Sequence, residues 1–177
     1  LAEGVNEINV RAIDKNKNIG KSSFMITRDF PVVSSTQKNV EIKDIRLIAG
    51  NYHAIVIGNN DYIYLPPLKK AVNEARSVGH TLNNEYGFKV KLLQNATRRD
   101  VLLALNEARK TLSRDDNLLI YYAGHGWLDE DEGRGYWIPV DAERDNNINW
   151  ISNASITDSV KAMKAKHVML VADSCYS

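Results

Sequence analysis

From residue 53 to residue 173, short runs of apolar residues alternate with segments whose apolar residues recur every three or four positions. Continuously apolar runs of this length are typical of strands buried on both faces of a parallel sheet, and the intervening period is that of an amphipathic helix. The expected strands are residues 53–58, 88–94, 117–124 and 167–173, with an extended piece at 136–140. The expected helices are residues 68–87, 97–112 and 155–166. The alternation predicts an α/β fold with a doubly wound, mainly parallel sheet and helices on both faces.

Two local signals mark helix ends in this pattern. Thr97 is followed three residues later by Asp100, which is the spacing of a capping box, so the second helix is expected to begin there. Gly87 closes the first helical segment and is a natural cap, because glycine adopts the left-handed backbone conformation at low cost.

Residues 1–29 have a different pattern from the rest of the chain. Apolar Ile8 and Val10 alternate with polar neighbours, turn residues follow, and the alternation resumes at Phe24 and Ile26, which predicts one short β-hairpin. A lone hairpin is marginally stable in water, so it must pack on something. The stretch resembles the last two strands of the immunoglobulin-like β-sandwich modules common on bacterial surface proteins. A hairpin that merely caps the main domain is the alternative.

The remainder divides into a linker and one main domain. Residues 30–51 lack a sustained period and contain Pro31, so we interpret them as a linker. The main domain covers residues 52–177. The resemblance of the N-terminal stretch to surface modules is the only indication of location, and it favours an extracytoplasmic one.

Composition and charge argue against several classes of function. A chain of 177 residues accommodates one well-packed domain and a small attachment. The net charge of +1 gives no broad electrostatic basis for binding nucleic acid or an anionic membrane. The longest apolar runs are far shorter than the roughly 20 residues that span a bilayer. The single cysteine, Cys175, excludes an internal disulfide and a cysteine-cluster zinc site.

Polar residues follow three of the expected strands at their carboxyl ends. They are Asn59–Asp61 after the first strand, Gly124–Gly126 after the third and Asp173–Cys175 after the last. In an open parallel sheet, ligands bind outside this edge. The three segments therefore form the expected functional edge of the domain.

Only one of the four histidines is expected at that edge. His53 and His167 open strands and so lie at the opposite edge, while His80 lies within a helix. His125 and Cys175 each follow the last apolar residue of a strand by two or three positions. The topology itself is therefore expected to bring one histidine near the one cysteine.

A histidine beside a cysteine has a well-defined chemistry. A thiol is only slightly ionised at neutral pH, and a nearby imidazole accepts its proton and so creates a strong nucleophile. The same imidazole later protonates a leaving amine. Taken alone, Cys175 would be interpreted as a small buried apolar residue, and the Gly-His-Gly segment as a flexible turn. Their expected position on one edge favours the catalytic interpretation.

The two motifs, YYAGHG and VADSCYS, resemble the histidine and cysteine motifs of caspase-like cysteine peptidases, where the histidine and cysteine lie about 50 residues apart, as His125 and Cys175 do. HAIVIGNNDY and LPPLKKAVNEA resemble the first strand and helix of the metacaspase branch of bacteria and lower eukaryotes. The resemblance covers residues 52–177 and implies a caspase-like fold. It also implies peptide-bond hydrolysis through a thioester at Cys175, with His125 as general acid and base.

The resemblance implies further features of the site and the domain. The backbone N–H groups of Gly126 and Cys175 would form the oxyanion site, and no third triad residue is required. In the family the domain continues past the cysteine with strands that complete the sheet and the substrate cleft. The C-terminal part of the domain is therefore expected to be missing here. A separate C-terminal small-subunit segment is a candidate partner, and this fragment is a candidate for being inactive alone.

The resemblance also makes a prediction about the substrate. Caspases that cut after aspartate hold the substrate carboxylate with an arginine shortly after the first strand, and residues 59–68 contain none. Metacaspase-like enzymes cut after Arg or Lys and have acidic residues in the S1 pocket, which match Asp173 and Glu74 here. The family usually has Asp where this chain has Glu74, so the choice between Arg and Lys stays open. A solvated helix residue is the alternative for Glu74.

Cofactors and alternative functions complete the expectations. No cofactor is required, and calcium is a candidate activator, because Asp129 and Asp131 lie in an acidic segment that supplies hard oxygen ligands. A solvated acidic loop is the favoured interpretation of that segment.

The main alternative function is a catalytically inactive caspase-like adaptor that retains the fold for protein interaction. A phosphate- or nucleotide-binding domain is disfavoured, because no P-loop or G-x-G-x-x-G motif follows any strand.

Overall fold

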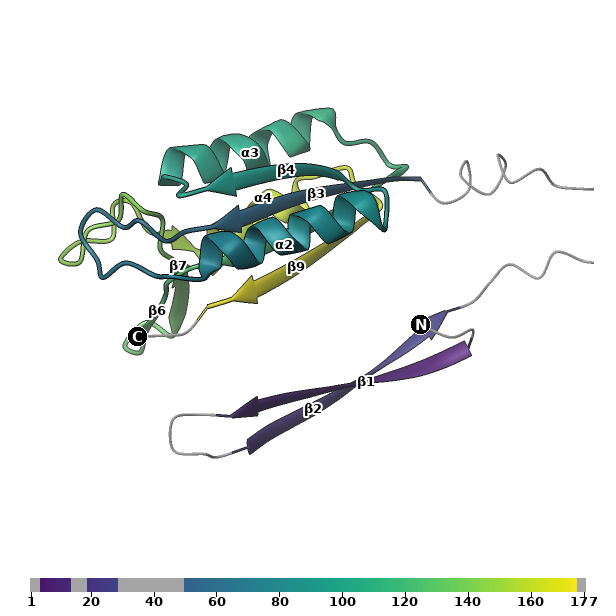
Figure 1. Ribbon diagram of the computed structural model, residues 1–177, viewed down its shortest axis with the longest axis horizontal. Helices are drawn as coiled ribbons and strands as arrows, with labels where there is room; N and C mark the ends of the chain where they lie inside the picture. The colour runs from purple at the N-terminus through teal and green to yellow at the C-terminus, as the bar shows by residue number, and fades with distance from the viewer. Residues whose placement is uncertain (1–3, 14–18, 29–49, 175–177) are drawn as a thin grey trace, which may run out of the picture. The chain divides into compact units, whose positions relative to one another are not determined.

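The computed structural model describes residues 4–13, 19–28 and 50–174 (Figure 1). The chain divides into two compact units, residues 1–43 and residues 44–177. In the first unit, strands β1 (Gly4–Ile13) and β2 (Ile19–Arg28) pair antiparallel, with Ile8 opposite Phe24. The N-terminal hairpin is thus present, whereas its origin in an immunoglobulin-like sandwich stays a prediction. Residues 30–49 of the expected linker lie outside the described residues.

A four-stranded parallel sheet forms the centre of the second unit. Its strands are β3 (Asn51–Gly58), β4 (Lys89–Gln94), β5 (Asp116–Ala123) and β9 (His167–Asp173). They lie in the order β4-β3-β5-β9, and all three pairings are parallel. Because β3 lies inside the sheet, the chain winds first to one side and then to the other. The doubly wound α/β prediction is confirmed.

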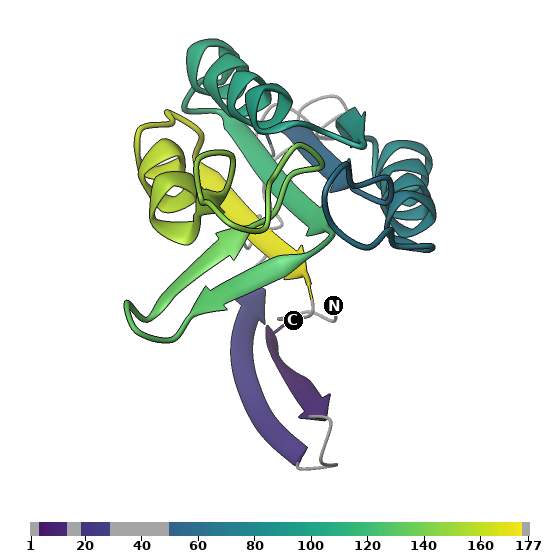
Figure 2. The ribbon, with the colours of Figure 1, turned by 90° about the vertical axis from the view of Figure 1, so that its left-hand side faces the viewer.

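Helices cover both faces of this sheet, as the sequence predicts. Helix α2 (Ala71–Asn84) lies on one face, and α3 (Arg98–Thr111) and α4 (Asn153–Lys161) lie on the other (Figure 2). Val101, Leu105 and Ile156 from the second face share a buried cluster with Ile57 and Ile120 of the sheet. Within the described part of the chain, no helix is long and apolar enough to cross a membrane.

Local sequence signals set some helix ends, and tertiary contacts set others. Thr97 and Asp100 form the predicted capping box of α3. Helix α2 begins at Ala71 rather than at residue 68, and its Val72 N–H donates to Asn60 Oδ1 at 3.2 Å from the loop after β3. Helix α4 spans Asn153–Lys161 instead of 155–166. It ends early, and the chain then turns so that Lys166 N–H donates to the Asp116 carbonyl at 2.7 Å.

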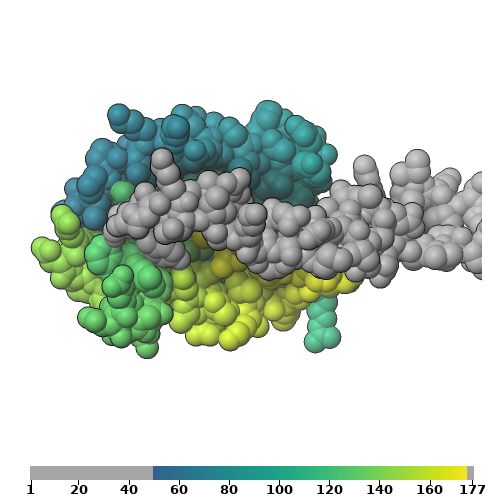
Figure 3. Space-filling model, turned by 90° about the horizontal axis from the view of Figure 1, so that it is seen from below, coloured from purple at the N-terminus to yellow at the C-terminus, as the bar shows by residue number. Residues whose placement is uncertain are grey.

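A second, antiparallel sheet follows β5 and was mostly missed by the sequence analysis. Its strands are β6 (Gly126–Asp129), β7 (Arg134–Trp137) and β8 (Ile151–Ser152), in that order. The pattern predicted only an extended piece at 136–140. Trp127 and Leu128 are both partly exposed, so they do not give the buried-strand signal. The Trp137 ring stacks on the Tyr122 ring of β5, with the ring centroids 4.5 Å apart. In Figure 3, the second sheet lies in the green part of the surface, beside the yellow part that α4 and β9 form.

A buried carboxylate joins the amino ends of the strands. Asp116 is 6% exposed and accepts hydrogen bonds from Ser113 N–H at 2.7 Å and Asn51 Nδ2 at 2.9 Å. The Ser113 backbone hydrogen bond is the main reason that the pKa of Asp116 falls from 3.8 to about 2. A carboxyl group whose pKa is lower in the folded state contributes stability above its unfolded pKa and loses it as pH falls towards the folded value.

We therefore expect Asp116→Asn to lower the free energy of unfolding at pH 7 by about 2 kcal/mol, because the variant lacks the charge that the hydrogen bonds stabilise. The difference from the natural chain should shrink as pH falls from about 4 to about 2, which urea denaturation at a series of pH values measures. The matched control is Asp115→Asn, because Asp115 is exposed and is the adjacent residue. Equal pH profiles for the two variants would contradict this role of Asp116.

Candidate active site

The carboxyl ends of β5 and β9 lie next to each other in the same register. Ala123 pairs with Asp173 at the end of the two parallel strands, and Gly124 N–H donates to the Asp173 carbonyl at 3.4 Å. His125 therefore lies two residues beyond the last pair on one strand, and Cys175 lies two residues beyond it on the other. Adjacent strands are about 4.8 Å apart. Cys175 itself lies outside the described residues, which end at Ser174.

Gly126 shows how closely the two segments approach. A Cβ atom on Gly126 would lie 2.9 Å from Ser174 Oγ and 3.2 Å from Ser174 Cβ. A side chain at residue 126 would therefore push the two segments apart. The residue after His125 thus contacts the residue before Cys175.

Two tyrosines hold the backbone of His125. The N–H of His125 donates to Tyr62 Oη at 2.7 Å, and its carbonyl accepts from Tyr122 Oη at 2.7 Å and from Ile138 N–H at 3.1 Å. The Tyr62 ring also lies against the imidazole, with centroids 4.6 Å apart. The sequence analysis missed both tyrosines, because nothing in the local pattern distinguishes them from ordinary core residues.

Burial keeps these tyrosines neutral. Tyr122 is 1% exposed, and burial raises its pKa well above 10.0, with a further contribution from Tyr62. Burial also raises the pKa of Tyr62. The hydroxyls that hold His125 therefore act as neutral hydrogen-bonding groups at physiological pH.

The imidazole is oriented by the carbonyl of Pro66. His125 Nε2 lies 2.9 Å from Pro66 O. A carbonyl only accepts hydrogen bonds, so Nε2 carries the proton and donates it. In the neutral imidazole Nδ1 is then unprotonated and is the nitrogen able to accept a proton. In this tautomer, Nδ1 is the nitrogen through which His125 could act as a general base.

Asparagines anchor the loop that carries Tyr62 and Pro66. Asn95 Oδ1 accepts from the backbone N–H groups of Asn60 and Asp61 at 2.8 and 3.1 Å, and buried Asn59 accepts from Ala96 N–H at 2.8 Å. Asn59–Asp61, which the sequence placed at the functional edge, thus act in this structure as anchors of the loop. Asn95 adopts a left-handed backbone with φ of 51°, which asparagine tolerates better than most residues.

Both predicted acidic residues face a cavity beside His125. The cavity has a volume of about 500 Å³, and its walls include Glu74, Asp173, Gly124 and His125, together with Lys69 and Lys70. Tyr121 Oη lies 3.4 Å from Asp173 Oδ2. Burial, and then the charges of Asp173 and Glu74, raise the pKa of Tyr121 to about 12. The fold thus brings residues 74, 125 and 173 to one cavity, and the role of Glu74 and Asp173 in holding a substrate side chain stays a prediction.

The chain matches the family of caspase domains over residues 51–177. This chain belongs to the caspase domain family. The family comprises caspase-like peptidase domains, so the predicted family is confirmed at that level.

Relatives of this caspase domain are distant and cover it in part. Human mucosa-associated lymphoid tissue lymphoma translocation protein 1 is 34% identical over 89 residues, which are 50% of this chain and 10% of that protein. Its homolog from Mus musculus matches to the same extent. The chain thus spans about a tenth of the length of these relatives. Protein GSU0716 from Geobacter sulfurreducens has the same fold, with a TM-score of 0.59 and 21% identity over 71% of this chain and 50% of that chain.

The acidic segment of the caspase domain forms a turn. Asp129 Oδ1 accepts from the N–H groups of Asp131 and Glu132 at 3.1 and 3.0 Å, and Glu132 pairs with Arg134 at 3.1 Å. Among the described residues, no group of three or more His, Cys, Asp or Glu is arranged to hold a metal ion. Calcium activation stays a prediction.

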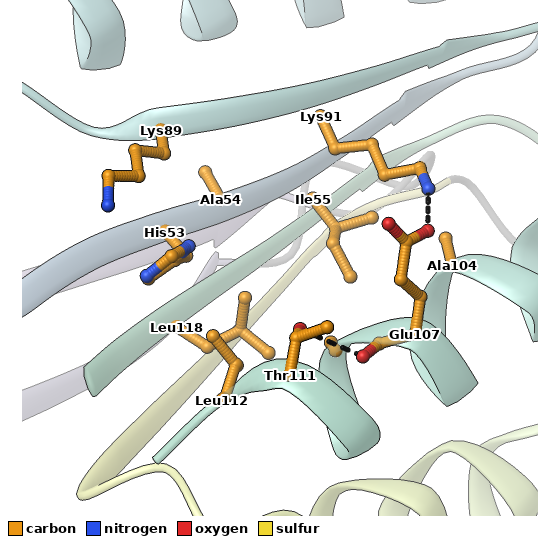
Figure 4. Close-up of a pocket in the computed structure, with 11 residues that line it drawn as sticks. His53, Ala54, Ile55, Lys89, Lys91, Ala104, Glu107, Thr111, Leu112 and Leu118 are labelled. Atoms are coloured by element: carbon orange, nitrogen blue, oxygen red, sulfur yellow. Dashed lines mark hydrogen bonds and ion pairs between the residues drawn. The ribbon is translucent and has the colours of Figure 1, made fainter. Parts of the chain in front are cut away.

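The other histidines lie away from the candidate site. His53 lies at the amino end of β3, with Nε2 3.5 Å from Asp116 Oδ1. Figure 4 shows His53 with Lys89 and Lys91 around a separate cavity at this end of the sheet, where Lys91 pairs with Glu107 of α3. His167 opens β9 and His80 is exposed on α2. Within residues 50–174, His125 is thus the one histidine at the functional edge.

We expect Gly124→Ala to disturb the tyrosine pair that holds His125. A Cβ at Gly124 would lie 2.6 Å from Tyr122 Oη and 2.7 Å from Tyr62 Oη, and both tyrosines are buried and cannot move away cheaply. Overpacking of this kind lowers the free energy of unfolding by about 1–3 kcal/mol. Urea denaturation measures the loss, and a shift of the His125 imidazole resonances in NMR spectra would accompany it.

The matched control is Gly79→Ala on helix α2, in which the new Cβ would lie 3.4 Å from Val90 Cγ1 of β4, an ordinary van der Waals contact. This variant should be as stable as the natural chain or more stable by up to about 1 kcal/mol, because alanine favours a helix over glycine. If Gly124→Ala behaved like this control, the close packing around residue 124 would not restrain His125.

Proposed function

We propose that this caspase domain is the catalytic domain of a cysteine endopeptidase, with Cys175 as nucleophile and His125 as general acid and base. The observation that carries the proposal is the register of β5 and β9, in which Ala123 pairs with Asp173. In this register, His125 and Cys175 each follow the last residue pair of two neighbouring strands by two positions. The contact of Gly126 with Ser174 supports the same proximity.

The proposed reaction follows from the histidine tautomer. Nδ1 of His125 accepts the thiol proton of Cys175, and the thiolate sulfur attacks the carbonyl carbon of the scissile peptide bond. The bond from that carbon to nitrogen then breaks, His125 returns the proton to the leaving amine, and a thioester remains on Cys175. Water, deprotonated by His125, hydrolyses the thioester and regenerates the thiol. The backbone N–H groups of Gly126 and Cys175 are proposed to stabilise the oxyanion.

The proposed P1 residue is Arg or Lys. The cavity beside His125 carries the carboxylates of Asp173 and Glu74, which suit a guanidinium or ammonium group. The Tyr121 hydroxyl donates to Asp173 Oδ2 at 3.4 Å and so places a neutral hydrogen-bond donor beside that carboxylate. Residues 59–68 contain no arginine that would instead hold an aspartate side chain. The metacaspase branch of the family is proposed on the same grounds.

We propose further that a C-terminal small-subunit segment pairs with β9. Among the described strands, β9 is an edge of the four-stranded sheet, and its Met169 and Leu170 are 61% and 45% exposed. Exposed apolar side chains on an unpaired edge favour pairing with a further strand. Assays of the proposed activity therefore need the full-length protein.

The central test is a panel of fluorogenic peptides with Arg, Lys or Asp at P1, with and without calcium. We expect the full-length protein to cleave after Arg or Lys and not after Asp, and Cys175→Ala to lose measurable turnover, because removal of the nucleophile leaves no covalent route. A rate that rises on addition of calcium would support calcium activation. Cleavage after Asp would contradict the acidic-pocket argument, and no turnover of any peptide would favour the inactive adaptor.

The acidic cavity is tested separately by charge removal. Asp173→Asn should lower kcat/KM for a P1 Arg peptide about 10- to 100-fold, because a charge-assisted hydrogen bond contributes about 1.5–3 kcal/mol. Glu74→Gln should give a smaller loss, and Glu74→Asp should change the ratio of Arg to Lys cleavage by altering the depth of the cavity. Glu85→Gln is the matched control, since Glu85 is exposed at the end of α2. Unchanged P1 preference in the Asp173 variant would overturn the assignment.

A further inference from the structure

A second hollow lies against His125 and differs in chemistry from the acidic cavity. It has a volume of about 190 Å³. Besides His125 and Gly126, its walls are formed by Leu65, Pro66, Ile138, Trp127, Trp150 and Arg144. Glu74 and Asp173 line the first cavity and not this one. The imidazole of His125 therefore borders an acidic cavity and an apolar hollow.

The apolar walls of the second hollow are held in place. The rings of Trp127 and Trp150 lie 5.6 Å apart, and Trp150 also packs edge-on against Tyr136 at 5.5 Å. Trp150 Nε1 donates to the Glu143 carbonyl at 2.8 Å, so its polar atom is already satisfied. Trp127 remains 39% exposed. A partly exposed tryptophan on a fixed apolar wall offers surface to an apolar side chain.

The size of the hollow suits one such side chain. An apolar cavity of roughly 150 Å³ binds a benzene molecule. At about 190 Å³, this hollow accommodates a phenyl or isobutyl group.

Among the described residues that line the hollow, Arg144 is the one charged residue other than His125, whereas the first cavity has the carboxylates of Glu74 and Asp173 together with Lys69 and Lys70. Arg144 is exposed and is not in any of the salt bridges of the described residues. Its positively charged guanidinium disfavours a lysine or arginine side chain in the hollow. A basic substrate residue is therefore directed to the acidic cavity and away from this hollow.

We propose that this hollow binds a large apolar side chain, such as Phe or Leu, of the substrate residue that follows the scissile bond. The inference rests on the proposed function. If a basic side chain occupies the cavity lined by Asp173, the scissile bond lies beside His125, and the chain after it continues past the imidazole towards Trp127. The structure thus assigns an apolar P1′ preference alongside the basic P1 preference.

Peptides that share a P1 Arg and differ only at P1′ test this inference on the full-length protein. With quenched-fluorescence peptides carrying Phe, Leu, Gly or Lys at P1′, we expect kcat/KM about tenfold higher for Phe and Leu than for Gly, because burial of a large apolar side chain favours the transition state by about that factor. Lys should be cleaved more slowly than Gly. Equal cleavage of all four peptides would overturn the inference and leave the proposed function standing.

Matched variants locate the effect in the hollow. Trp127→Ala should reduce the ratio of Phe to Gly cleavage at least threefold, whereas Leu128→Ala should leave it unchanged, because Leu128 is 44% exposed on the same strand and does not line the hollow. Arg144→Glu should raise cleavage of the Lys peptide relative to Gly. Arg114→Glu makes the same charge change at the opposite edge of the sheet and should not. A Trp127 variant that kept the full preference would overturn the inference.

A binding experiment separates this inference from the proposed function. Tripeptide amides that begin with Phe or Gly are titrated into the Cys175→Ala protein, and isothermal titration calorimetry measures binding. Preferential binding of the Phe peptide that is lost in a Cys175→Ala/Trp127→Ala double variant supports the hollow as an apolar-residue site, even where no peptide is cleaved and the proposed function fails. Absence of both cleavage and Phe-selective binding would overturn both.

Discussion

The parallel register between β5 and β9 sets the spacing of the two segments on which the candidate site depends. Ala123 and Asp173 form the last pair, so the chain leaves both strands at the same level. A slip of one residue would exchange the faces of the side chains along β9 and would move Asp173 out of the acidic cavity. The backbone pairing along β5 and β9 and the packing of partly buried Val168 against the core cluster accompany this register. The geometry around His125 is therefore a consequence of how the sheet is assembled.

Neutral groups hold His125, and charged groups surround it at a distance. Tyr62 and Tyr122 contact its backbone with hydroxyls that burial keeps protonated, and the Pro66 carbonyl selects the tautomer. The carboxylates of Asp173 and Glu74 lie in the cavity on one side, and Arg144 lies at the hollow on the other. Among the described residues, the imidazole thus has no carboxylate partner, and its orientation comes from backbone and phenol groups. In the proposed reaction, this separation would let the cavity bind a cationic side chain without a direct ion pair between its carboxylates and His125.

Much of the fold could be predicted because local patterns and tertiary packing agree. The two central strands, β3 and β5, have continuous apolar runs and are largely buried, and residues Thr97 and Asp100 form the capping box of α3 within a few positions of each other. The antiparallel sheet of β6, β7 and β8 escaped prediction because its strands are short and partly exposed. The start of α2 and the end of α4 differ from the predicted residues. Hydrogen bonds from Asn60 and Asp116, which lie outside these helices, form there and are not visible in the local pattern.

The sequence by itself determined that His125 is the one histidine expected at the functional edge and that Asp173 lies on the same edge, since both follow apolar strands at their carboxyl ends. It also determined the family through motifs that are local in the chain. Only the tertiary structure decided which atoms surround the imidazole. Tyr62 and Pro66 are about sixty residues from His125, and Trp127 and Trp150 meet through a sheet that has no strong local signal. Such contacts depend on how loops are anchored across the fold, and a periodic pattern along the chain carries no information about them.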